Sequence, residues 1–82
     1  MNRTLLLAHL AQVERHIREG ERHLSRQREI VAELERHGRG HSRTTQMARD
    51  LLDSFEMAQS AHLNDRAHLL QALRAQPQRI DY

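Results

Sequence analysis

Residues 6–34 carry a repeating pattern in which the step between seam positions alternates between four and three. The positions are Leu6, Leu10, Val13, Ile17, Gly20, Leu24, Gln27, Val31 and Leu34. Such heptad spacing is typical of a helix that packs along a narrow seam against a second helix. Only Gly20 and Gln27 are not apolar. The pattern predicts one helix from about residue 4 to about residue 37, roughly 50 Å long at about 1.5 Å per residue.

A reversal of the chain is predicted directly after this helix, over residues 38–42. The basic residues Arg36 and His37 precede Gly38 and Gly40. Basic residues in a last turn followed by glycine are a common end of a helix. A connector this short between two long helices predicts an antiparallel hairpin.

A second helix is predicted over about 43–75, with Ser42 or Thr44 as its N-cap. Pro77 is expected to end it, and residues 77–82 are expected to form a C-terminal tail. The predicted seam of this helix is Ala48, Leu51, Phe55, Ala58, His62, Asp65, Leu69 and Ala72. The fold class is therefore all-α, an antiparallel two-helix coiled-coil hairpin in one domain, residues 1–76.

Folding the chain about residue 41 predicts which residues of the two seams meet. This register places Gly20 opposite His62. A glycine inside a helix costs about 1 kcal/mol relative to alanine, so we interpret Gly20 as the residue that makes room for an imidazole. The same register pairs Val31 with Leu51, Gln27 with Phe55, Leu24 with Ala58, and Val13 with Leu69.

Composition narrows the class of protein further. The chain has 82 residues, of which 38% are hydrophobic and 2% aromatic, too few for a compact globule with a thick core. Without cysteine it has no disulfide or thiolate chemistry. The N-terminal leucine run is too short for a signal peptide or a membrane span, so a cytoplasmic protein is expected. We find no catalytic motif, and we predict a non-enzymatic protein.

Two helices alone bury little apolar surface. Further apolar residues lie beside the predicted first seam or elsewhere on the second helix, where only another layer of helices would cover them. They are Leu5, Leu7, Ile30, Met47, Leu52, Ala61, Leu63, Leu70 and Leu73. We therefore expect self-association, most simply a two-fold homodimer that forms a four-helix bundle. The alternative is that another protein, in a larger complex, covers these apolar residues.

A stripe of histidines flanks the first seam. The tripeptide Glu-Arg-His begins at residues 14, 21 and 35, which places histidines at the same point of successive heptads. This side of the predicted hairpin carries no full charge, and imidazole suits a wet interface, so we predict that it is the surface for a second hairpin. The predicted interface residues are His9, His16, His23, Ile30, Met47, Ala61 and His68.

A histidine-based metal-binding or pH-responsive bundle is the first alternative. The patterns H-x-x-E-x-x-x-H at 16–23 and H-x-x-D-x-x-H at 62–68 bring side chains to one helical face. Imidazole and carboxylate bind zinc, nickel, copper or iron. The candidate ligands are His16, His23, His62, Asp65 and His68, and His16 is expected to face His68. Free histidine titrates near pH 6.5, so self-association is expected to weaken between about pH 7 and 5.5.

A weak nucleic-acid accessory role is the second alternative. Arg39, His41 and Arg43 would form a basic tip on the hairpin. The net charge of +2 argues against a dedicated nucleic-acid binder. The tip also has no aromatic residue on which a base could stack.

Three stretches of the chain carry a resemblance to known sequences. The runs RQREIVAELERHGRGH, ARDLLDSF and HLNDRAHLL resemble a group of short uncharacterised bacterial proteins. The resemblance covers most of residues 5–73 and implies a free-standing bacterial helical-hairpin protein. It implies no activity, cofactor or functional residue. The function expected from the sequence is therefore that of a small self-associating interaction or scaffolding module without a cofactor.

Overall fold

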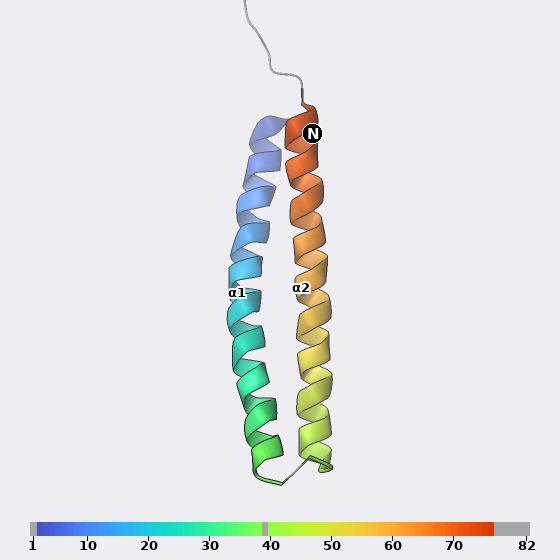
Figure 1. Cartoon of the computed structure of the whole chain (residues 1–82). Helices are drawn as coiled ribbons and strands as arrows, with labels where there is room; N and C mark the ends of the chain where they lie inside the picture. Colours follow the sequence, from blue (N-terminus) through green and yellow to red (C-terminus); the bar gives the residue numbers. More distant parts are fainter. Residues whose placement is uncertain (1, 39, 77–82) are drawn as a thin grey trace, which may run out of the picture.

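The computed structural model describes residues 2–38 and 40–76. This part of the chain folds into two helices, α1 (Arg3–Arg36) and α2 (Arg43–Ala75). The helices run antiparallel and lie side by side, with the connector at one end (Figure 1). The predicted all-α hairpin is thereby confirmed. The predicted tail, residues 77–82, lies outside the described residues, as do Met1 and Arg39.

The two ends of α1 are closed by side-chain and backbone hydrogen bonds. The side-chain oxygen of Asn2 accepts a hydrogen bond from the backbone N–H of Leu5 at 2.8 Å. At the other end, the backbone N–H of Gly38 donates to the carbonyl of Glu35 at 3.2 Å. Gly38 has a φ of 72°, a left-handed conformation that glycine adopts without the steric cost of a Cβ atom. The glycine expected to end the helix therefore makes the reversal possible.

The start of α2 is fixed to the connector and to α1. Ser42 accepts a hydrogen bond through its Oγ from the backbone N–H of Thr45 at 3.1 Å, the usual N-cap contact. Arg49 donates to the carbonyl of Gly40 at 2.9 Å and to the carboxylate of Glu35 at 2.8 Å. One guanidinium thus joins the last turn of α1, the connector and the second turn of α2.

The seam of α1 lies where the heptad pattern places it. Leu6, Ile17, Leu24, Gln27 and Val31 are buried. The other predicted seam residues of this helix are half-buried: Leu10, Val13, Gly20 and Leu34. α1 therefore turns the whole predicted seam toward α2.

The seam of α2 differs from the prediction at three alternate positions. Leu51 is 46% exposed, and Ala58 and Asp65 are also exposed, so their placement in the seam is wrong. Their neighbours in the chain face α1 instead: Leu52 and Arg66 are half-buried and Gln59 is buried. Ala48, Phe55, His62, Leu69 and Ala72 are half-buried, as they would be in either arrangement.

The register between the helices also differs from the prediction, by one helical turn. The ring of His62 lies against that of His16, not opposite Gly20. The ring of Phe55 lies against that of His23, not opposite Gln27. In both pairs the partner on α1 is one turn nearer the N-terminus than predicted. The predicted pairings of Leu24 with Ala58 and Val31 with Leu51 are wrong as well, because Ala58 and Leu51 lie outside the seam.

Two buried glutamines account for this register. The side-chain amide of Gln27 donates to the carbonyl of Ala48 on α2 at 2.9 Å. The side-chain amide of Gln59 donates in the other direction, to the carbonyl of Ile17 on α1 at 2.9 Å. A buried polar group left without a partner costs about 1–3 kcal/mol. A shift of one turn would break both contacts, so these amides favour the observed alignment.

Gly20 gives the Gln59 side chain its space. A Cβ atom at residue 20 would overlap the Oε1 atom of Gln59 and lie 2.8 Å from its Cδ atom. The glycine in the middle of α1 therefore accommodates an amide, not the imidazole of His62 as the sequence suggested.

The core of the hairpin is thin. Within residues 2–38 and 40–76, the buried apolar side chains are Leu6, Ile17, Leu24 and Val31. A larger set of bulky apolar residues is exposed: Leu5, Leu7, Ile30, Met47, Leu51, Met57, Leu63 and Leu70. In the described part of the chain, neither helix contains an apolar stretch of the length and hydropathy that crossing a membrane requires.

Candidate functional site

One long side of the hairpin brings the histidine stripe of α1 next to α2. We call this side the histidine face and define it by the residues that line its two grooves, together with their heptad neighbours. α1 contributes Leu5, His9, Gln12, His16, Glu19, His23 and Ile30, and α2 contributes Met47, Leu51, Phe55, Ala58, His62, Asp65, His68 and Leu69; the other lining residues, Val13, Gly20 and Gln59, are counted with the seam. Residues three, four or seven apart share one side of a helix, so this set forms a continuous strip. Leu51, Ala58 and Asp65 belong to this strip because their neighbours Leu52, Gln59 and Arg66 face α1.

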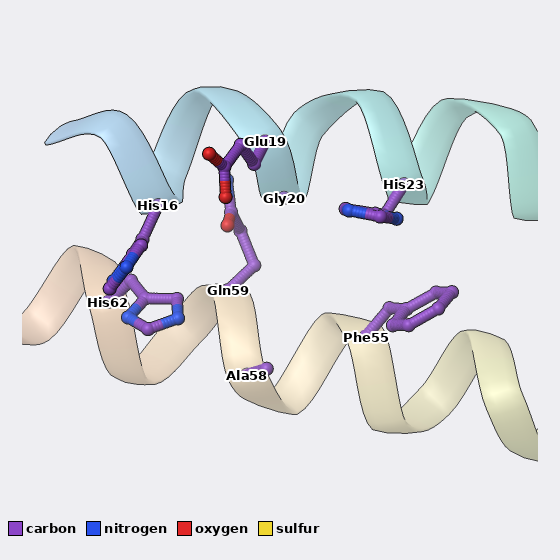
Figure 2. A pocket seen from close by; sticks show the side chains of 8 residues that line it. All are labelled: His16, Glu19, Gly20, His23, Phe55, Ala58, Gln59 and His62. Atoms are coloured by element: carbon purple, nitrogen blue, oxygen red, sulfur yellow. The ribbon is translucent and has the colours of Figure 1, made fainter. Parts of the chain in front are cut away.

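The central groove of this face lies halfway along the hairpin and has a volume of about 240 Å³. Its lining residues are His16, Glu19, Gly20, His23, Phe55, Ala58, Gln59 and His62 (Figure 2). Both helices contribute to it, and the Gln59 side chain occupies the space that Gly20 leaves. The groove combines imidazole, carboxylate and amide groups with an aromatic ring.

His16 and His62 form a pair across this groove. Their ring centroids are 5.1 Å apart and the ring planes are tilted by 50°. Both residues are half-buried. Figure 2 shows the two rings approaching each other from opposite helices. The fold thus holds two imidazoles together at a point accessible from outside.

A second ring contact lies two turns away, where His23 meets Phe55. The centroids are 5.5 Å apart and the planes are tilted by 43°. Tilted rings at this separation have the geometry favoured by aromatic pairs. His23 is exposed and Phe55 is half-buried, so this ring contact is partly open to solvent.

Gln59 supplies a polar atom at the base of the groove. The side chain is 7% exposed and reaches from α2 toward α1 beside Gly20 (Figure 2). Its Nε2 atom donates a hydrogen bond to the carbonyl oxygen of Ile17. Its Oε1 atom is buried and has no hydrogen-bond partner within the described residues. The base of the groove therefore carries an acceptor with unused hydrogen-bonding capacity.

A second groove lies nearer the open end of the hairpin. It has a volume of about 390 Å³ and is lined by His9, Gln12, Val13, Asp65, His68 and Leu69. Asp65 and His68, two of the five predicted metal ligands, line this groove. The other three, His16, His23 and His62, line the central groove.

The register explains why the predicted ligand set is divided. His16 was expected to face His68, but it faces His62, one to two turns away from that residue. Among residues 2–38 and 40–76, no three His, Cys, Asp or Glu side chains are arranged to hold a metal ion. The described part of one chain thus brings together a pair of the predicted ligands, not the full set.

The predicted interface residues remain open to solvent. His9, His23, Ile30, Met47, Ala61 and His68 are exposed, and His16 is half-buried. Met47 is among the most exposed of the large apolar residues. This surface is therefore accessible to a partner.

The ion pairs of the described residues lie elsewhere, at the connector end. Glu33 contacts His37 at 2.8 Å and also pairs with Arg36, while Arg49 pairs with Glu35. The hydrogen bonds from His37 and Arg36, together with their charges, lower the pKa of Glu33 below its ordinary value of 4.5. These contacts act on the end of α1 and leave the histidine face free of ion pairs.

Sequence reasoning did not identify Gln59 and Glu19 as parts of this site. Gln59 follows Ala58 directly, and the apolar residue was the natural choice for the seam. The available signal was the second glutamine, Gln27, which stands inside the predicted seam of α1 and suggests that amides belong in this interface.

No family model, curated protein or solved structure matches the chain. The resemblance to short bacterial helical-hairpin proteins therefore stays a prediction.

Proposed function

We propose that the protein is a small non-enzymatic interaction or scaffolding module that self-associates, with two copies packing through their histidine faces into a four-helix bundle. The observation that supports this proposal is the exposed apolar surface on that face. Leu5, Ile30, Met47 and Leu51 are all exposed there, beside a thin core. A second hairpin is the simplest structure that covers them.

The available area suits such a dimer. Helices of 34 and 33 residues are about 50 Å long and about 10 Å wide each, so one side of the hairpin offers on the order of 1,000 Å². A stable protein–protein interface buries about 800 Å² on each partner. One face of one hairpin is therefore large enough, without any contribution from other parts of the chain.

The chemistry of the face suits a copy of itself. A two-fold interface brings the same surface patch together with itself, so like charges in the patch would repel. Neutral histidine carries one hydrogen-bond donor and one acceptor, and it can therefore pair with another histidine. His9, His16, His23 and His62 are thus compatible with a two-fold partner. The face also carries the carboxylates of Glu19 and Asp65, to which imidazole N–H groups of a second copy can donate.

The test is the molar mass in solution, measured by light scattering or sedimentation over a range of concentrations. We expect the unmodified chain to be dimeric and Leu51→Glu, which adds a charge to the histidine face, to be mainly monomeric. Met57→Glu is the control, because Met57 is 74% exposed, lies two residues from the buried Gln59 and hence on the side of α2 opposite α1, and is not among the residues that define the histidine face. A monomeric unmodified chain at high concentration, or equal effects of the two variants, would refute the proposal.

The second alternative, a nucleic-acid accessory role, stays a prediction. Its basic tip includes Arg39, which lies outside the described residues, and Arg43 is the first residue of α2. Retention on nucleic acid that decreases steeply with salt would support this role.

A further inference from the structure

The separation of His16 and His62 fits two ligands on one metal ion, and it also fits a packed aromatic pair. Zn²⁺ in proteins is bound tetrahedrally, with about 2.0–2.1 Å between the metal and an imidazole nitrogen, so the centroids of two such rings lie about 5 Å apart. The observed centroid separation is 5.1 Å. The rings also come from different helices, which the seam between α1 and α2 holds at a fixed distance.

The groove around this pair has the groups that support metal-bound histidines. A metal-binding imidazole commonly donates its second N–H to a carboxylate or to another oxygen. The carboxylate of Glu19 and the buried, unpartnered Oε1 atom of Gln59 both belong to this groove. Figure 2 shows both side chains between the imidazole pair and the ring of His23.

A single copy supplies two imidazoles at this point, and structural zinc sites use four ligands. In the proposed dimer, a two-fold axis beside the pair would bring the same two residues of the second copy to the same place. The pair lies within about two turns of the middle of both helices, so such an axis leaves most of the two hairpins in contact.

We infer that two copies of the chain together bind one transition-metal dication of the Zn²⁺ class, with His16 and His62 of each copy as the four ligands. This inference rests on the proposed dimer, since the site is incomplete in one copy. The metal would join the two copies at the centre of the histidine face. Binding requires neutral imidazole, so protons compete with the metal for these ligands.

The experiment is native mass spectrometry of the full chain, with Zn²⁺ added and after treatment with a chelator, which reports subunit number and metal content together. We expect one Zn²⁺ per two chains and a weaker dimer after chelation. Titration with Co²⁺ should give the intense visible absorption of a tetrahedral site. Octahedral Co²⁺ absorbs weakly, so this readout reports geometry as well as binding.

Variants locate the ligands. His16→Ala and His62→Ala should each weaken metal binding by more than about 10-fold, since even outer partners of metal ligands contribute about 10- to 100-fold. His68→Ala, in the other groove of the same face, should bind as the unmodified chain does. Circular dichroism establishes that each variant keeps its helices.

The outcomes separate this inference from the proposed dimer. A dimer that binds no metal, or that binds it equally well after His62→Ala, overturns the inference and leaves the proposed function standing. One metal ion bound to a single chain also overturns it. A monomer with and without metal overturns both.

Discussion

A methyl group at residue 20 would occupy the space of the Gln59 amide. The role of this glycine in making room for the amide can therefore be tested by substitution. In an open helix, replacing glycine by alanine stabilises by about 1 kcal/mol. Here the new Cβ atom would lie 2.8 Å from the Gln59 Cδ atom, and the amide would have to leave its hydrogen bond to Ile17. We therefore expect Gly20→Ala to destabilise the protein by about 1–2 kcal/mol, measured by urea unfolding at fixed protein concentration.

A double-mutant cycle assigns this effect to the amide. In a Gln59→Ala background the obstacle is absent, and Gly20→Ala should become neutral or stabilising. If Gly20→Ala destabilises equally in both backgrounds, Gln59 is not the cause.

A second residue-scale prediction concerns Glu33 at the end of α1. Its pKa is lowered by His37 and Arg36, so the folded state releases its proton more readily than the unfolded chain does. The stabilisation by this carboxylate is therefore present above the unfolded value of 4.5 and is lost as the pH falls through the lower folded value. Below about pH 4.5, the unmodified chain should lose thermal stability more steeply than Glu33→Gln. Because Glu33 is exposed, we expect a small difference, and parallel acid profiles for the two proteins would contradict the assignment.

At the scale of the helices, the register can be tested by cross-linking, because the chain contains no cysteine. Ile30 lies one heptad after His23, and Ala48 lies one heptad before Phe55, so Ile30 and Ala48 repeat the His23–Phe55 relation in the antiparallel hairpin. A disulfide requires Cα atoms about 4.4–6.8 Å apart. We expect Ile30→Cys with Ala48→Cys to oxidise readily within one chain.

The control pair combines Ile30→Cys with Leu52→Cys, which the register read from the apolar pattern would place opposite each other. It should oxidise slowly, because Leu52 lies one turn along α2 and nearer the other side of the seam. Faster oxidation of the control pair would show that the helices align as the apolar pattern suggested.

The difference between predicted and observed register has a physical cause. Heptad spacing reports which side of a helix is apolar, and it was sufficient for α1 and for the antiparallel arrangement of the two helices. In α2, Leu51 and Leu52 are both apolar, and Ala58 is a more apolar choice than Gln59. The apolar pattern therefore assigned Leu51 and Ala58 to the seam, where the structure has Leu52 and Gln59. Heptad spacing does not show which carbonyl of the opposite helix a side-chain amide reaches, and the hydrogen bonds of Gln27 and Gln59 favour the observed alignment.

For the candidate site, too, the side of the helix could be predicted from the sequence, but the partners across the seam could not. The histidine stripe on α1 followed from the repeat itself, because identical heptad positions share a side of the helix. The partners of these histidines depended on the register, so the pairing of His16 with His62 could not be read from the sequence. Leu51 was predicted to lie in the seam, but it belongs to the exposed face because Leu52 faces α1 in its place.

At the scale of the whole molecule, the histidine pair makes the proposed dimer sensitive to acid. Protonation of both His16 and His62 would place two positive charges on rings 5.1 Å apart, and a two-fold partner would add two more. His23 and Glu19 face the same groove, and one carboxylate per copy cannot balance three imidazolium groups. Acidification from neutral pH is therefore expected to weaken the dimer through this charge repulsion, with helical content retained. Sedimentation at several pH values measures this. His16→Gln together with His62→Gln should reduce the dependence in metal-free buffer, with His9 and His23 still on the face. A molar mass unchanged between neutral and acidic pH in the unmodified chain would show that the pair lies outside the interface.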